Sequence, residues 1–407
     1  MNQKTKLHIA LPVLNELDYI NIFLECVRSQ TYKNFELYVC VNQPDDWWEN
    51  DEKKYICTNN SKTIRLLESI KDIPITIIDR SSRKSGWKGR RHGVGWARKN
   101  IMDYIEKVAY SSDIIISLDA DTTFSKDYFN SIVDSYSQNP TTVAISVPYY
   151  HNLVEDEGTN RAILRYEIYM RYYAINLWRI KSPYSFTALG SAIALPVKSY
   201  RTIGGLTPKM SGEDFYFLQK LRKYGKILNW NPEKVYPGTR FSDRVYFGTG
   251  PAMIKGKLGD WDSYPIYDFN AFNEVKKTYE LFPTLFNESV ETPMSKFLIS
   301  IFKDDNIWES LRNNNKIAER FVKACHEKID GLRVLQFLKQ KNESSRKSDE
   351  KKLYDFMQKF YKTQTPDFLN KDFLFAKASV KELNNLRNVL MEIEEYYQKN
   401  NELEINK

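Results

Sequence analysis

Short apolar runs alternate with helical patterns over the first 250 residues, and this alternation constrains the fold more than any other feature. The runs are β-branched and nearly continuous, as in strands of a parallel sheet covered on both faces; they lie at 6–13, 35–41, 75–78 and 113–118. Apolar stripes with i, i+3, i+4 spacing at 20–27, 97–108 and 129–136 predict helices between them. Such an alternation predicts an open α/β sheet.

The composition of the sequence changes near residue 270. Glycine becomes rare there, and long amphipathic patterns rich in Lys and Glu begin. The stretch 380–397 is the clearest of these helical patterns. A length of 407 residues also suits about two domains. We therefore predict an α/β domain at 1–255 and a mainly helical region at 270–407.

Composition excludes several classes of protein. The chain carries 22 Phe, 27 Tyr and 8 Trp, enough for a core, so disorder is excluded as its main state. No run approaches the ~18 apolar residues that a membrane span needs, and the first residues do not look like a secretory signal. Four scattered cysteines without a Cys-x-x-Cys pair favour a reducing, cytoplasmic setting. The net charge of +8 points to an anionic partner.

Two carboxylates follow the fourth predicted strand. Asp119 and Asp121 are two residues apart, so in extended chain they point the same way. They lie at the edge where open α/β sheets bind ligands. This pattern predicts a site for Mn²⁺ or Mg²⁺, completed by water and substrate oxygens. A turn without function is the alternative that these residues leave open. An EF-hand is excluded, because Phe124 and Asn130 replace the Gly and Glu of that loop.

The same residues also resemble the start of haloacid dehalogenase-like phosphatases, which begin with strand-Asp-x-Asp-x-Thr. Here the motif would comprise Asp119, Asp121 and Thr123, the first Asp accepting a phosphoryl group. That motif normally follows the first strand, whereas several β/α units precede it in this chain. The phosphatase is the main alternative chemistry.

The sequence Gly-Glu-Asp at 212–214 stands at the start of a predicted helix. Ser211 and Asp214 fit a capping box with Asp in the place of Glu, which is the structural interpretation. A carboxylate at the start of a helix near a metal site can also take a proton from an incoming hydroxyl. The local pattern alone favours the cap.

A basic segment joins the third strand to the next helix. It holds eight cations, no acid and several interleaved glycines between Arg80 and Lys99. Cations and close backbone approach suit a diphosphate, so Lys88 and Arg91 are candidate phosphate contacts. Neither phosphate-loop consensus is present. A solvated loop or a nucleic-acid-binding module is the alternative.

Together these motifs resemble family 2 glycosyltransferases of the GT-A fold, across about residues 5 to 250. The motifs occur in the family's order, from Leu-Pro-Val-Leu-Asn-Glu after the first strand to Gly-Glu-Asp. The resemblance implies a mixed Rossmann-like sheet flanked by helices, with the helical C-terminal region appended. It implies an inverting, metal-dependent enzyme that moves a sugar from a nucleotide-diphosphate sugar to an acceptor hydroxyl.

The resemblance also implies roles for individual residues. Asp214 would be the catalytic base with Glu213 beside it, and Asp121 the metal ligand with Asp119 near metal and ribose. The candidate contacts to the nucleotide are Pro12, Asn15, Glu16, Asn42, Asp79, Lys88, Arg91, Arg98, Asp119 and Arg244. Two positions depart from the family pattern. Asn42 begins Asn-Gln-Pro-Asp in place of Asp-Asp-Gly-Ser, and Lys99 replaces the usual Asn.

The family's usual setting gives the remaining expectations. We expect a glycan or lipid-linked acceptor, a role in bacterial cell-surface polysaccharide biosynthesis, and no nucleic-acid partner. The expected location is the cytoplasm, with peripheral association at the inner membrane face left open. The function of 270–407 in binding acceptor, partner or a second copy is also open.

Overall fold

The computed structural model describes residues 5–209, 212–240, 249–257 and 259–405, without the side chains at 249–251 and 401–405. Its contacts divide the chain into two compact units. The first comprises 1–163, 186–258 and 402–407, and the second comprises 164–185 and 259–401. The second unit thus includes a segment, 164–185, from within the predicted first domain. The predicted boundaries themselves stay a prediction.

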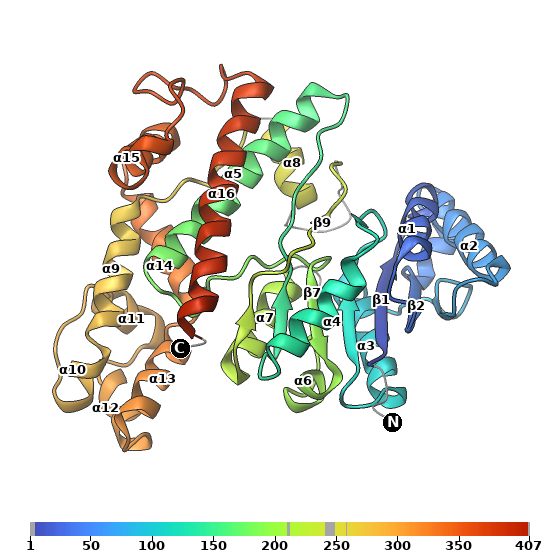
Figure 1. Cartoon of the computed structure of the whole chain (residues 1–407), viewed down its shortest axis with the longest axis horizontal. Coiled ribbons are helices and arrows are strands. Elements are labelled where there is room, and N and C mark those ends of the chain that lie inside the picture. The colour runs from blue at the N-terminus through green and yellow to red at the C-terminus, as the bar shows by residue number, and fades with distance from the viewer. Residues whose placement is uncertain (1–4, 210–211, 241–248, 258, 406–407) are drawn as a thin grey trace. The chain divides into compact units, whose positions relative to one another are not determined.

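A seven-stranded sheet in the order β3-β2-β1-β4-β7-β6-β8 forms the centre of the first unit (Figure 1). Its strands are β1 (Leu7–Val13), β2 (Phe35–Asn42), β3 (Ile75–Arg80), β4 (Ile114–Ser117), β6 (Ala144–Ser146), β7 (Ile193–Pro196) and β8 (Ile227–Leu228). The four strands predicted from sequence are confirmed as β1 to β4, which run parallel. β7 is antiparallel to both β4 and β6, so the sheet is mixed. Strands β5 (Thr123–Phe124) and β9 (Val235–Tyr236) pair separately.

The helices of the first unit bury the stripes that the sequence shows. They are α1 (Leu17–Ser29), α2 (Lys54–Ser69), α3 (Val94–Val108), α4 (Tyr128–Gln138), the start of α5 (Glu157–Arg179), α6 (Val197–Thr202), α7 (Glu213–Tyr224) and α8 (Thr249–Lys257), with the 3₁₀ helix η1 (Asp45–Glu49). Phe23 of α1 and Ile101 of α3 are fully buried. Val108, the last member of the predicted α3 stripe, is instead exposed, because it stands at the end of the helix.

The second unit is helical, as predicted for the C-terminal region. It holds most of α5, the helices α9 (Phe269–Glu280), α10 (Phe282–Asn287), α11 (Ser295–Phe302), α12 (Ile307–Asn314), α13 (Ala318–Lys328), α14 (Gly331–Glu343) and α15 (Asp349–Phe360), most of α16 (Val380–Ile405), and η2 (Lys362–Gln364). Tyr166 and Tyr172 of α5 are buried, which favours a core role for this tyrosine-rich stretch over an acceptor cleft.

A buried ion network joins α5 to α16 within the second unit. Arg171 donates from Nε to Glu167 at 2.9 Å and from Nη1 to Glu394 at 2.7 Å. Arg387 donates from Nη1 to the other carboxylate oxygen of Glu167 at 3.0 Å. Buried charges are tolerated when they are paired in this way. Among the described residues, no helix is long and apolar enough to cross a membrane.

Candidate functional site

The carboxyl ends of the parallel strands bring the predicted acidic residues to one edge of the sheet. β4 ends at Ser117, and Asp119 and Asp121 follow it directly. Helix α7 begins at Glu213, with Gly212 as its N-cap in the left-handed conformation (φ 72°). The N-cap therefore differs from the Ser211 of the predicted capping box, and Ser211 itself lies outside the described residues.

Arg98 connects the two acidic motifs. Its guanidinium donates from Nη2 to Oδ1 of Asp119 at 2.7 Å and from Nη1 to Oε1 of Glu213. The Arg98 side chain is 2% exposed and that of Glu213 is 3% exposed. Charge-assisted bonds of this kind are strong in a buried setting. Arg98 of α3 thereby fixes the position of the Asp-x-Asp turn relative to the start of α7.

Glycine at two positions lets the backbone pack against this cluster. A Cβ at Gly190 would lie 2.4 Å from Nη2 of Arg98, and a Cβ at Gly95 would lie 2.3 Å from the carbonyl oxygen of Lys209. The carbonyl of Gly190 also accepts a 2.7 Å bond from Oγ of Ser117 at the end of β4. No side chain fits at these distances, so the close approach depends on glycine.

The two carboxyl groups at the start of α7 both have raised pKa values. Burial raises the pKa of Glu213 to about 7, although the charge of Arg98 opposes the rise. Burial likewise raises the pKa of Asp214, again against Arg98. Oδ1 of Asp214 accepts a 2.7 Å bond from the backbone N–H of Phe215. A carboxyl group whose pKa is raised by burial is suited to proton transfer.

Arg240 provides a second guanidinium at the site. Its Nε donates to Oδ2 of Asp121 at 2.7 Å, and its Nη2 lies 2.8 Å from both carboxylate oxygens of Glu16. The guanidinium also lies 4.1 Å from the ring centroid of Tyr19. A Cβ at Gly238 would lie 2.9 Å from Oδ2 of Asp121, so this approach too depends on glycine.

Sequence reasoning missed Arg240 and selected Arg244 in the same segment. Arg244 lies outside the described residues. The only sequence signal for Arg240 was a cation in a Gly-Thr-Arg stretch shortly after β9. Its pairing with Glu16 and Asp121 joins segments more than a hundred residues apart, which spacing along the chain could not predict.

The acidic residues suit a divalent cation in their chemistry. Asp119 and Asp121 supply hard carboxylate oxygens, which Mg²⁺ and Mn²⁺ prefer. The described residues contain no group of three or more His, Cys, Asp or Glu able to hold a metal. Each of the two aspartates is also paired with an arginine. A cation held here would therefore draw its other ligands from water and the bound substrate.

The candidate nucleotide contacts line the ends of β1 to β3. Pro12 is buried within β1, and Asn15 in the following turn has a positive φ of 57°. Asn42 ends β2 and is buried. Its amide donates to the carbonyl of Val13 at 2.8 Å and accepts from Nε1 of Trp87 at 3.1 Å. The Asn42 amide thus joins β1 to the basic segment.

Asp79 near the end of β3 is fixed by the turn that follows it. Its Oδ1 accepts backbone N–H bonds from Ser81 at 2.8 Å and Ser82 at 3.0 Å. Burial raises the pKa of Asp79, but these hydrogen bonds outweigh burial and lower it overall. The carboxylate is therefore ionised and held in one orientation.

The basic segment does not form a single cationic patch. Lys88 and Arg91 are exposed, as a phosphate-binding loop requires. Arg83 instead pairs with Glu49, and Lys99 pairs with Asp103 at 2.7 Å. Arg98 belongs to the buried cluster at the sheet edge. Three of the eight cations, Arg83, Arg98 and Lys99, are thus paired with carboxylates, and the phosphate-binding role of Lys88 and Arg91 stays a prediction.

The sequence comparison identifies the class of protein that these motifs define. Residues 8–203 match the family model described as glycosyl transferase family 2. This segment belongs to that family, as the motifs predicted, and the chain is a glycosyltransferase. The mixed sheet and its helices are those expected of the GT-A fold. The family match favours the transferase over the phosphatase and the nucleic-acid-binding module.

Comparisons with individual proteins add more distant similarities. No curated protein matches the sequence. TarS 1–349 of S. aureus in complex with UDP-GlcNAc is 13% identical, with 97% of this chain and 92% of that chain covered and a TM-score of 0.40. The mannosyltransferase PcManGT from Pyrobaculum calidifontis, in complex with GDP-Man and Mn²⁺, is 13% identical, with coverages of 96% and 86% and a TM-score of 0.38. The family assignment rests on the family model alone.

Proposed function

We propose that this glycosyltransferase moves a sugar from a nucleotide-diphosphate sugar to an acceptor hydroxyl, with inversion at the anomeric carbon. The observation that carries the proposal is the pairing of Arg98 with both Asp119 and Glu213 at the sheet edge. This pairing fixes the Asp-x-Asp turn beside the start of α7, where Asp214 lies. This arrangement supports a donor site at the Asp-x-Asp turn with Asp214 beside it as the proton acceptor.

Asp214 is the proposed general base. It would take the proton of the acceptor hydroxyl as that oxygen attacks the anomeric carbon, so no covalent enzyme intermediate is needed. Its raised pKa increases its affinity for that proton. Glu213, bonded to Arg98, is the proposed positioning partner that holds the first turn of α7 in place.

The remaining residues are proposed to bind the donor. Asp119 and Asp121 would hold Mn²⁺ or Mg²⁺, which when bound supplies positive charge to the leaving diphosphate. Lys88 and Arg91 would add charge from the exposed loop. Pro12, Asn15, Glu16, Asn42, Asp79, Arg98 and Arg244 stay proposed contacts to the nucleotide. The glycan or lipid-linked acceptor, the cell-surface pathway and the cytoplasmic or peripheral membrane location stay predictions.

A thermal-shift screen of sugar nucleotides, with and without Mn²⁺, tests the proposal. A ligand that binds only the folded state stabilises it by about 2.7 kcal/mol at a hundredfold excess over its dissociation constant. We expect a metal-dependent shift with one class of UDP-, GDP- or dTDP-sugar. Absence of a shift with every sugar nucleotide, together with release of phosphate from a phosphomonoester, would instead indicate the phosphatase.

A further inference from the structure

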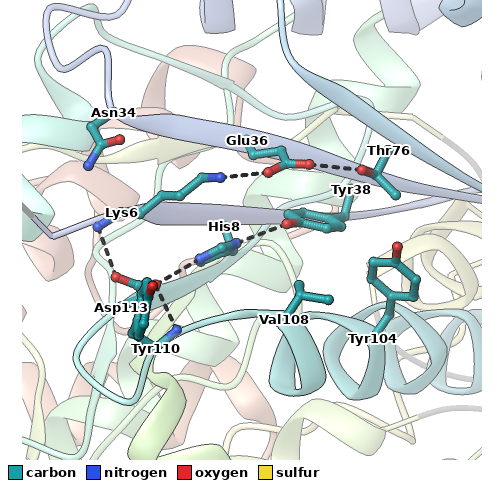
Figure 2. A pocket seen from close by; sticks show the side chains of 10 residues that line it. All are labelled: Lys6, His8, Asn34, Glu36, Tyr38, Thr76, Tyr104, Val108, Tyr110 and Asp113. Carbon is teal, nitrogen blue, oxygen red and sulfur yellow. Dashed lines mark hydrogen bonds and ion pairs between the residues drawn. The ribbon is translucent and has the colours of Figure 1, made fainter.

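A cavity lies at the opposite edge of the sheet from the candidate active site. Its volume is about 580 Å³, and it is lined by the first residues of β1 and β2, by β3 and by the end of α3 (Figure 2). Lys6 and Glu36 stand at the amino ends of the parallel strands, whereas Asp119 follows the carboxyl end of β4. The cavity is therefore separate from the acidic cluster.

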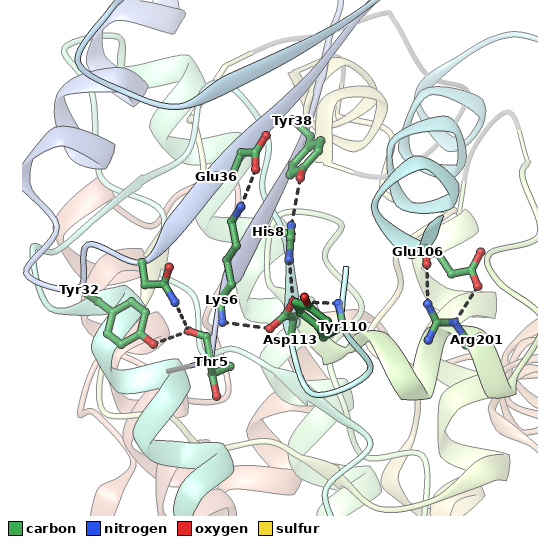
Figure 3. Close-up of polar contacts among 11 residues, drawn as sticks. Thr5, Lys6, His8, Tyr32, Glu36, Tyr38, Glu106, Tyr110, Asp113 and Arg201 are labelled. Atoms are coloured by element: carbon green, nitrogen blue, oxygen red, sulfur yellow. Dashed lines mark hydrogen bonds and ion pairs between the residues drawn. The ribbon is translucent and has the colours of Figure 1, made fainter. Parts of the chain in front are cut away.

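One wall of the cavity is a chain of hydrogen bonds through a buried histidine. Nδ1 of His8 lies 3.2 Å from the hydroxyl of Tyr38, and Nε2 lies 3.3 Å from Oδ2 of Asp113 (Figure 3). Asp113 also accepts backbone bonds from Lys6 at 3.1 Å and Tyr110 at 3.0 Å. Burial lowers the pKa of His8 even though Asp113 opposes the shift. This wall therefore presents a fixed polar surface.

A second set of polar side chains, Lys6, Glu36 and Thr76, lies beside the hydrogen bonds of His8. Nζ of Lys6 pairs with Oε2 of Glu36 at 2.7 Å, and Oγ1 of Thr76 donates to Oε1 of Glu36 at 2.8 Å. The ammonium group of Lys6 is paired with Glu36, and Asp113 is hydrogen-bonded to His8, so the lining holds two carboxylates and one ammonium group. An anion such as a phosphate gains little from such a lining. A neutral molecule rich in hydroxyl groups suits it better, because both donors and acceptors are present.

Aromatic rings complete the lining. Tyr38 is buried, and its ring centroid lies 5.9 Å from that of Tyr104. Tyr104 and Tyr110 are 43% and 64% exposed, so both rings are accessible to a molecule in the cavity. A phenol ring has an apolar face and a polar hydroxyl, so it contacts molecules that are apolar on one side and polar at the rim.

We propose that this cavity binds a neutral sugar unit of a glycan, with Tyr104 stacking on the sugar ring and Glu36 and Lys6 bonding to its hydroxyls. Sugar rings combine apolar C–H faces with peripheral hydroxyls, which matches this combination of tyrosines and paired polar groups. A glycosyltransferase with such a site holds a glycan chain on the side of the sheet remote from transfer. The proposal uses the glycosyltransferase class only and does not depend on the proposed base or donor.

The test measures binding of neutral tetrasaccharides to the full chain by titration calorimetry. Maltotetraose, chitotetraose and mannotetraose serve as probes, and inorganic phosphate is the charged control. We expect at least one tetrasaccharide to bind and Tyr104→Ala to weaken that binding at least tenfold. Tyr55→Ala is the matched control, because Tyr55 is also an exposed tyrosine, 58% accessible, on a helix of the same unit and away from the cavity.

Further variants separate this site from the active site. Thr76→Val removes the hydroxyl beside Glu36 while keeping the side-chain shape, and it should also weaken tetrasaccharide binding. Asp214→Asn should leave that binding unchanged even where it abolishes transfer. The proposal is overturned if no tetrasaccharide binds, if Tyr104→Ala and Tyr55→Ala behave alike, or if only Asp214→Asn removes binding.

Discussion

Nε of Arg240 donates to Oδ2 of Asp121 at 2.7 Å, so a guanidinium pairs with the second carboxylate of the Asp-x-Asp motif. The same guanidinium contacts Glu16 after β1. A positive charge therefore already stands beside the carboxylate that is proposed to bind a divalent cation. Cation binding at Asp121 and pairing with Arg240 oppose each other for this reason.

Removal of this guanidinium should strengthen cation binding. In Arg240→Ala, Asp121 and Glu16 face each other without a cation, so we expect Mn²⁺ to bind about tenfold more tightly in the absence of nucleotide, a gain of about 1.4 kcal/mol. Electron paramagnetic resonance of free Mn²⁺ measures this affinity. Arg201→Ala, which breaks a surface pair with Glu106, should leave it unchanged. If the unchanged protein, Arg240→Ala and Arg201→Ala bound Mn²⁺ with equal affinity, Asp121 would not be a ligand of the metal.

Loss of the proposed base should remove catalysis and spare binding. Asp214→Asn keeps the shape of the side chain but cannot accept the acceptor proton, so kcat should fall by roughly 10²–10⁴-fold. The dissociation constant for the donor should change little. Steady-state assays and donor titration measure the two quantities. Transfer at nearly the original rate would exclude Asp214 as the base.

The raised pKa of Glu213 predicts a pH-dependent stability. The group ionises at about 4.5 when unfolded and at about 7 when folded. Its stabilising effect is therefore complete below pH 4.5 and is lost as the pH rises through 7. Glu213→Gln removes this titration, so the decline in unfolding free energy between pH 4.5 and 7 should become shallower. Urea denaturation across this range measures the slope. Parallel pH profiles for the two proteins would contradict the assignment.

The close approach at Gly190 should not tolerate even one methyl group. Gly190→Ala places a Cβ 2.4 Å from Nη2 of Arg98, and overpacking of this kind costs about 1–3 kcal/mol. We also expect transfer to fall, because Arg98 must move away from Asp119. Gly158→Ala is the matched control, since its nearest neighbour would lie 3.5 Å away. Thermal unfolding and activity assays compare the two variants. If Gly190→Ala were as stable and as active as Gly158→Ala, Arg98 could shift without cost and the prediction would be wrong.

The ion network of the second unit should contribute strongly to its stability. Glu167→Gln leaves Arg171 and Arg387 without their shared charge in a buried setting, and breaking such a network costs about 3–5 kcal/mol. Asp72→Asn, which breaks the exposed pair with Arg28, should leave stability nearly unchanged. Denaturant unfolding of both variants provides the measurement. Similar midpoints would show that the buried network is not required.

Local sequence patterns predicted the first four strands, several helices, the fold class and the family. The β-branched runs became β1 to β4, the apolar stripes became helices, and the Asp-x-Asp turn lies after β4 as predicted. Periodicity carries this information because one face of each element must be buried. The family was predicted from its motifs, because they occur along the chain in the family's order.

Which charged groups pair with one another is visible only in the folded chain. It paired Arg98 with Asp119 and Glu213, brought Arg240 to Asp121, and assembled the cavity around His8 from four separate segments. These contacts join residues 21 to 119 positions apart, and the sequence contains no period that links them. Long-range pairing depends on how the sheet aligns its strands and on which side chains burial forces together, so it exists only in the folded chain.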